Sequence, residues 1–262
     1  MSACSFKAAF AGLTDVGLMR EHNEDSILWD TDLGLALLAD GMGGHNAGEV
    51  ASALAVEHIR RALRERLLAN DEETIAEYES VVRDAVEFAN SFIFGQSQSQ
   101  IECAGMGTTL ALMLLVDSRV IVAHVGDSRI YRLRNKQLTQ ITSDHSLVQE
   151  LVNGGYLTEE DARLSVSKNL ITRALGIGEE VEVEIMDDEA SLDDVYLLCS
   201  DGLSDLVADA EIQKILLDNA DDKEAAAKQL ISLANEKGGS DNISVVLVSI
   251  HEAFSDDNGI SD

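Results

Sequence analysis

Four aspartates lie at the ends of apolar stretches, each beside a glycine or a small polar residue: Asp40, Asp127, Asp201 and Asp241. Any one of them could serve only a turn, because Asp-Gly and Asp-Ser are ordinary turn dipeptides. Their recurrence instead predicts several carboxylates at one end of a folded core, where they repel one another unless cations neutralise them. Oxygen ligands without a histidine–cysteine set favour Mg2+ or Mn2+ over Zn2+.

The elements that must position these aspartates follow from hydrophobic periodicity. Alternating and apolar stretches predict strands at residues 6–10, 27–29, 33–39, 109–116, 120–125, 130–133, 181–185, 195–199 and 243–250. Spacings of three and four predict helices near residues 56–67, 75–93, 147–152, 210–217 and 223–235, with Asn70 or Asp71 capping the second. Helices come in pairs between groups of strands, which does not match a βαβ rhythm. We expect an α+β fold with four layers, α-β-β-α, in which helix pairs flank two antiparallel sheets.

Six segments together resemble the metal-dependent protein phosphatase (PPM) family, the type 2C serine/threonine phosphatases. They are Arg20…Asn23-Glu24-Asp25, Ala39-Asp40-Gly41-Met42-Gly43-Gly44-His45, Gly105-Met106-Gly107-Thr108-Thr109, Val125-Gly126-Asp127-Ser128-Arg129, Cys199-Ser200-Asp201-Gly202-Leu203 and Asp241-Asn242-Ile243-Ser244. A single segment is a weak signal, but six in the family's order, within about residues 10–250, are specific. The Asp-Gly-Met-Gly-Gly form is similar to that of the short bacterial members.

The resemblance implies a metal ligand set. Asp40 resembles the carboxylate that bridges two metal ions, and the Gly41 carbonyl resembles a ligand of one of them. Asp201 and Asp241 resemble ligands of the other ion, and Asp127 resembles the ligand of a third, weaker ion seen in bacterial members. The implied cofactors are Mn2+ or Mg2+, with two ions in the core site and a third that binds more weakly.

The resemblance also implies catalytic roles. Glu24 and Asp25 resemble residues that hold metal-bound waters, and Arg20 resembles the clamp on the phosphate, for which a planar guanidinium is suited. Two metals about 3.5–4 Å apart can hold a bridging hydroxide that attacks phosphorus in line, without a covalent intermediate. The leaving oxygen needs a proton from a metal-bound water or from a side chain. His45 is the candidate acid, and the alternative is that it caps a helix or contacts substrate.

Residues 144–172 resemble the family's flap, a mobile segment beside the active site that affects substrate choice. Ser165 and Val166 stand where many bacterial members carry a His-Pro pair, so flap shape and specificity do not carry over. We expect one catalytic domain over residues 1–262, in which residues 251–262 form a flexible acidic tail.

Composition limits the partners. The chain carries 48 acidic and 19 basic residues, a net charge of −29, which argues against nucleic acid and anionic membranes. Three cysteines without a C-x-x-C pair indicate a reducing compartment, and Cys199 in an apolar stretch is expected to be an inert core thiol. No apolar run reaches eighteen residues. We expect a cytoplasmic monomer.

The predicted function is hydrolysis of phosphoserine and phosphothreonine in proteins, opposing a bacterial eukaryote-like serine/threonine kinase. The alternative is a catalytically weak relative that acts as a binding or regulatory module, although every expected ligand position carries the expected residue. A metal phosphodiesterase or nuclease conflicts with the negative charge.

Overall fold

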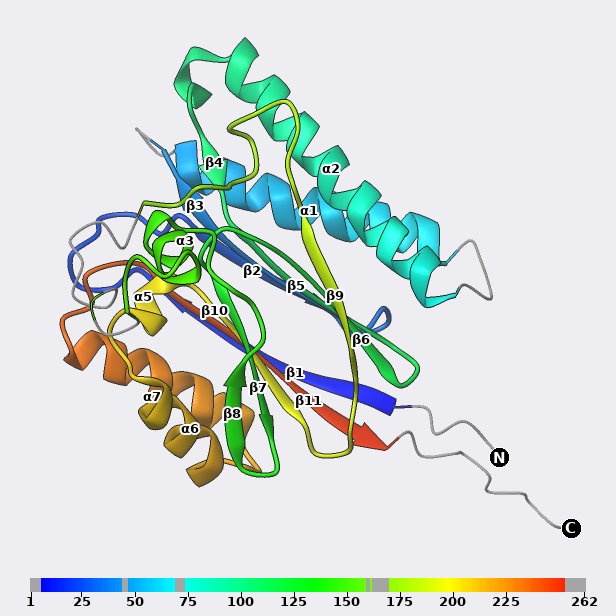
Figure 1. Ribbon diagram of the computed structural model, residues 1–262, viewed down its shortest axis with the longest axis vertical. Helices are drawn as coiled ribbons and strands as arrows, with labels where there is room; N and C mark the ends of the chain where they lie inside the picture. Colours follow the sequence, from blue (N-terminus) through cyan, green and yellow to red (C-terminus); the bar gives the residue numbers. More distant parts are fainter. Residues whose placement is uncertain (1–5, 44–46, 69–73, 159–160, 162–169, 253–262) are drawn as a thin grey trace, which may run out of the picture.

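The computed structural model describes residues 6–43, 47–68, 74–158, 161 and 170–252, and the structural statements below concern these residues. Two antiparallel sheets form its centre (Figure 1). The first sheet has the order β1 (Phe6–Asp15), β11 (Ile243–Glu252), β10 (Val195–Cys199), β7 (Arg129–Arg134) and β8 (Gln137–Gln140). The second has the order β2 (Asp25–Asp30), β3 (Leu35–Met42), β5 (Leu110–Val116), β6 (Arg119–Val125) and β9 (Glu184–Glu189), and β4 (Gly107–Thr108) pairs with β3.

Helix pairs cover the outer faces of both sheets. The helices α1 (Ala47–Leu67) and α2 (Ile75–Ser99) pack on the second sheet, and α6 (Asp209–Asp218) and α7 (Lys223–Glu236) pack on the first (Figure 1). Short helices occupy the connections: η1 (Ile101–Cys103), α3 (Leu147–Asn153) and α5 (Asp201–Ser204). The predicted α-β-β-α sandwich is therefore confirmed. None of the helices in the described ranges is both long enough and apolar enough to cross a bilayer.

Three apolar clusters separate the four layers. Along β3, Leu35 and Leu37 face the helices α1 and α2, whereas Ala36 and Leu38 face the other sheet. This strand is buried on both faces, as its unbroken apolar sequence predicts. A third cluster, which includes Leu230, fills the space between the first sheet and α6 and α7.

The strand directions bring the predicted site residues to one end of the sandwich. Because β3 and β6 are both antiparallel to β5, they run in the same direction, and Asp40 and Asp127 lie at corresponding ends. In the other sheet, β10 ends where β11 begins, so Asp201 and Asp241 become neighbours.

Some element boundaries differ from the prediction. The strand predicted at residues 181–185 is β9, which begins at Glu184 and ends at Glu189, because its pairing with β6 rather than its own apolar pattern sets its limits. The predicted cap of α2 was wrong, since Thr74 is the N-cap and forms a capping box with Glu77. Strand β11 extends through Glu252, and residues 253–262 of the predicted tail lie outside the described ranges.

Candidate metal centre and active site

Five aspartates converge at the end of the sandwich. The β2–β3 register places Asp25 directly opposite Asp40. The carboxyl of Asp40 interacts electrostatically with those of Asp25, Asp201, Asp127 and Asp241, which come from both sheets. The structure thus brings together the four aspartates predicted as metal ligands, with Asp25 beside them.

Burial and like charge act together on these carboxyls. Burial raises the pKa of Asp40 well above its usual range, and the charges of Asp25 and Asp201 raise it further. Burial is also the largest cause of the raised pKa of Asp201, followed by the charge of Asp127. Burial raises the pKa of Asp25 to about 6, and burial followed by the charge of Asp144 raises that of Asp127 to about 6. The cluster therefore requires protons or cations to offset its charge.

The donor set fits hard divalent cations. All the converging side chains offer carboxylate oxygens, the ligands that Mg2+ and Mn2+ prefer. The Oδ1 atom of Asp25 is buried and has no hydrogen-bond partner in the part of the chain that the structure describes, whereas its Oδ2 accepts a hydrogen bond from Ser200 Oγ at 2.9 Å. Asp40, Asp201 and Asp241 keep some exposed surface, so ions can reach them from solvent.

Gly41 stands where no larger residue fits. A Cβ atom at this position would lie 2.2 Å from the carbonyl oxygen of Gly48 and 2.5 Å from that of Glu24. The Gly41 N–H donates to the Glu24 carbonyl at 3.1 Å. The glycine thereby lets the segment that carries Glu24 lie directly against the end of β3.

Arg20 lies at the rim of the cluster. Its Nη2 donates to Asp241 Oδ2 at 2.7 Å, and about half of the Arg20 side chain is exposed. Burial raises the pKa of Glu24, which the charge of Arg20 opposes. An exposed guanidinium beside a carboxylate cluster is placed to meet an incoming anion.

Asn242, to which the sequence analysis gave no role, connects the segment that carries Arg20 and Glu24 to the start of β11. Asn242 Oδ1 accepts from the Glu24 N–H at 2.8 Å, and its Nδ2 donates to the carbonyls of Val16 at 3.0 Å and His22 at 2.9 Å. Asn242 therefore fastens the loop that carries Arg20 to the start of β11. In the sequence, its position next to Asp241 in a family motif could have indicated that it supports the site.

A hydroxyl pair links the ends of β3 and β6. Thr109 Oγ1 accepts from the Asp40 N–H at 2.9 Å and lies 2.7 Å from Ser128 Oγ. Ser128 directly follows Asp127. The buried Thr109–Ser128 contact therefore links the backbone of Asp40 to the residue next to Asp127.

The segment predicted as the flap is anchored on both sides of α3. Arg129 holds Asp144 through Nε at 2.9 Å and Nη2 at 2.7 Å. The Leu147 N–H donates to the Leu170 carbonyl at 2.9 Å. A cavity of about 520 Å³ lies between α3 and the α5 region, and Asp127, Asp201 and Arg129 are among its lining residues. His45 and residues 159–160 and 162–169 lie outside the described ranges.

Comparisons with known proteins agree with this geometry. A family model described as "Protein phosphatase 2C" matches residues 19–246. The "Serine/threonine phosphatase stp" of Listeria monocytogenes is 41% identical over 238 residues, which cover 90% of this chain and 93% of that protein.

Two crystal structures extend the similarity to three dimensions. That of the Mycobacterium tuberculosis serine/threonine phosphatase PstP/Ppp has a TM-score of 0.85 at 40% identity, covering 94% of this chain and 100% of that one. The catalytic domain of PstP in complex with two manganese ions has a TM-score of 0.83 at 40% identity, covering 95% and 100%. The chain therefore belongs to the protein phosphatase 2C family and is a protein phosphatase of that family, as its motifs predicted.

Proposed function

We propose that this chain hydrolyses phosphoserine and phosphothreonine monoesters in proteins by direct attack of water at phosphorus, with divalent cations in the aspartate cluster. The convergence of Asp40, Asp201, Asp241, Asp127 and Asp25 carries this proposal. The names of the serine/threonine phosphatase relatives support the substrate class. When bound, two such ions lower the pKa of water and shield the phosphoryl oxygens.

The ligand roles follow the resemblance to the family, and the convergence of the aspartates is compatible with them. Asp40 lies centrally and would bridge both ions, with the Gly41 carbonyl on one and Asp201 and Asp241 on the other. Asp127 would hold a third, weaker ion, as its resemblance to that ligand in bacterial members implies; it lies near Asp40 and lines the cavity beside Asp201. The manganese complex of PstP supports Mn2+ in the core site, and Mg2+ is the alternative ion.

The remaining residues orient the reactants. Arg20 is proposed to bind the phosphate of the substrate, because its partial exposure lets it exchange Asp241 for an anion of higher charge. Asp25 and Glu24 would hold waters beside the ions, and the unpartnered Oδ1 of Asp25 is available for such a water. His45 or a water would supply the proton to the leaving oxygen.

The cellular setting is also part of the proposal. A phosphoprotein phosphatase needs a kinase that makes its substrate, so a cognate serine/threonine kinase is expected. The buried, unpaired Cys103 and Cys199 are consistent with the cytoplasm. We propose one catalytic domain that acts as a monomer, without nucleic-acid or membrane partners. A regulatory module without catalysis would not need the complete ligand set.

The decisive experiment measures hydrolysis of a phosphothreonine peptide with Mn2+ and with chelator. The Asp40→Asn variant should lose at least about two orders of magnitude in rate, because it weakens the bridging ligand. The matched control is Asp32→Asn, since Asp32 is 75% exposed and pairs with Arg64 outside the cluster. Undiminished turnover without metal, or an Asp40→Asn variant as active as the Asp32→Asn control, would refute the proposal.

A further inference from the structure

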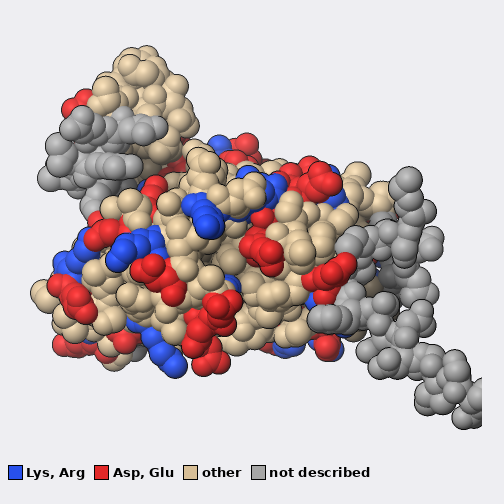
Figure 2. Space-filling model, turned by 90° about the horizontal axis from the view of Figure 1, so that it is seen from below, with Lys and Arg blue, Asp and Glu red and all other residues tan. Residues whose placement is uncertain are grey.

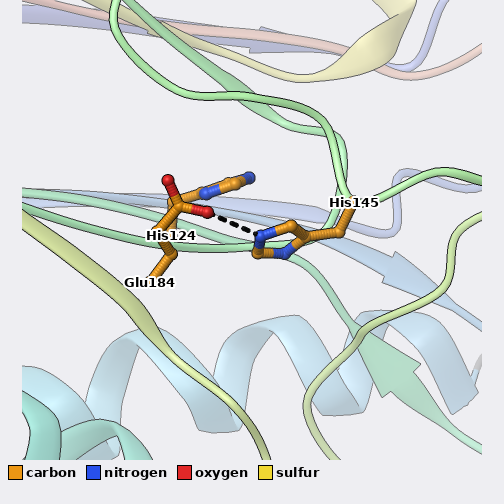
Figure 3. A group of neighbouring side chains, drawn as sticks. All are labelled: His124, His145 and Glu184. Atoms are coloured by element: carbon orange, nitrogen blue, oxygen red, sulfur yellow. Dashed lines mark hydrogen bonds and ion pairs between the residues drawn. The ribbon is translucent and has the colours of Figure 1, made fainter. Parts of the chain in front are cut away.

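Two histidines and a glutamate form a second group of potential ligands, apart from the aspartate cluster (Figure 3). His124 lies on β6 directly opposite Glu184 of β9, and His145 precedes α3. One ligand atom of each residue lies within 4.8 Å of those of the other two. Their side chains point toward one another from three separate segments (Figure 3).

His124 has an unused nitrogen. The ring is wholly buried, and its Nε2 lies 2.9 Å from the Gly126 carbonyl, to which it can only donate. Nδ1 therefore keeps its lone pair, and this buried atom has no hydrogen-bond partner among the described residues. Burial lowers the pKa of His124 to about 4, which keeps the ring neutral. An imidazole whose other nitrogen donates to a backbone carbonyl is the form in which histidine binds metals.

His145 and Glu184 complete the group. His145 Nε2 lies 3.1 Å from Glu184 Oε2. The two imidazole rings lie with their centroids 4.1 Å apart. The Glu184 side chain is 38% exposed, so an ion from solvent meets this carboxylate before the buried rings.

We propose that His124 Nδ1, His145 Nε2 and the Glu184 carboxylate bind one zinc-like transition-metal ion. Two imidazoles and one carboxylate are a ligand set suited to Zn2+, whereas the aspartate cluster offers only oxygen. Ligand atoms of a tetrahedral zinc lie about 3.3–3.5 Å apart, given bonds of about 2.0–2.2 Å. The His145 Nε2–Glu184 Oε2 distance of 3.1 Å is slightly shorter than this separation, and one ring nitrogen of His124 lies within 4.8 Å of the ligand atoms of both residues, so the three side chains must adjust when an ion binds.

Binding has two local consequences. Arg173 Nη1 lies 3.4 Å from His145 Nε2 while its Nη2 pairs with Glu182 at 3.1 Å, so this cation must move away. His145 Nδ1 now accepts from the Gly126 N–H at 3.2 Å. A neutral ring that binds metal through Nε2 carries its proton on Nδ1, so that hydrogen bond must break. The ion would thereby act on the turn that leads into Asp127.

Calorimetric titration of Zn2+ into the protein saturated with Mg2+ tests the site, because Mg2+ occupies oxygen ligands and binds imidazole poorly. His124→Gln keeps an amide donor for the Gly126 carbonyl but removes Nδ1. Glu184→Gln keeps an acceptor for His145 but removes the charge. The matched control is Glu189→Gln, the same change at the other end of β9, where the side chain is exposed.

We expect the wild type and Glu189→Gln to bind one Zn2+ in the presence of Mg2+. His124→Gln and Glu184→Gln should each weaken this binding at least about tenfold. Arg173→Gln should tighten it, because a competing cation is removed. Co2+ in place of Zn2+ gives a second readout through the visible absorption of a four- or five-coordinate ion. Absence of the Zn2+ equivalent in the wild type, or equal affinity in Glu184→Gln and Glu189→Gln, would overturn the proposal.

Discussion

At the scale of single residues, the aspartate cluster depends on neighbours that carry no charge. Ser200 donates to Asp25, Thr109 accepts from the Asp40 N–H, and Asn242 holds the Glu24 segment. These polar groups position carboxylates that would otherwise repel one another. The chemistry of the site therefore rests on hydrogen bonds as well as on the ligands themselves.

Replacing Asn242 by alanine should separate this support from catalysis. The side chain is nearly fully buried and makes three hydrogen bonds, so its loss should reduce the free energy of unfolding by about 2–3 kcal/mol. It should also raise the Mn2+ concentration needed for half-maximal activity, because the Glu24 segment is released. Asn219→Ala, which removes hydrogen bonds at the end of α6, should affect stability alone. Unchanged Mn2+ dependence in Asn242→Ala would contradict this role.

The raised pKa values of Asp25 and Asp127, both about 6, set the pH dependence of the metal-free protein. A carboxyl whose folded pKa exceeds its unfolded value stabilises the fold at pH values below the unfolded pKa, and this contribution is lost as pH rises through about 6. Chelator-treated protein should therefore lose this stabilisation progressively as pH rises from about 4 to about 6.5. Added Mn2+ should raise the melting temperature more at about pH 7.5 than at about pH 5, because protons compete less with the ion for the carboxylates at the higher pH. An equal Mn2+-induced rise in melting temperature at about pH 5 and about pH 7.5 would be inconsistent with Mn2+ binding by these carboxylates.

At the scale of the elements, sequence patterns located the strands whose packing is simple. Strands β3 and β5 are buried throughout almost their full length, and their apolar runs predicted the limits of β5 within one residue and those of β3 within three. Strand β8 was not predicted, because Gln137–Gln140 contains one apolar residue and its pairing depends on the preceding turn. The contacts of Asn242 and Ser200 likewise arise only when distant segments meet.

The same turn offers a stability test. Asn135 and Lys136 have φ angles of 51° and 64°, the backbone form of a two-residue hairpin in which Asn-Gly is favoured. Lys136→Gly should increase the free energy of unfolding by about 0.5–1 kcal/mol, since lysine is strained at positive φ. Gln137→Gly, one residue later in the extended strand, should reduce it. Chemical denaturation of both variants measures the difference, and equal effects would contradict the turn assignment.

At the scale of the whole molecule, charge is the dominant surface property. Acidic and basic side chains are interspersed on the face shown in Figure 2, but the chain as a whole carries a net charge of −29. Self-repulsion of this size destabilises the compact state, and salt screens it within about 10 Å at 0.1 M. The melting temperature should therefore rise with NaCl in both the metal-free and the Mn2+-bound protein. A fall with increasing salt would show that local ion pairs outweigh the net charge.

The pairing of β1 with β11 also determines where the enzyme can be attached to another domain or to a surface. Phe6 lies opposite Glu252, so both strands leave the sheet side by side (Figure 1). Strand β11 starts next to Asp241 and runs for ten residues, which places this end about 30 Å from the metal centre. An anchor or reporter domain joined next to Phe6 or Glu252 would therefore lie at the end of the sandwich opposite the aspartate cluster and leave that cluster accessible.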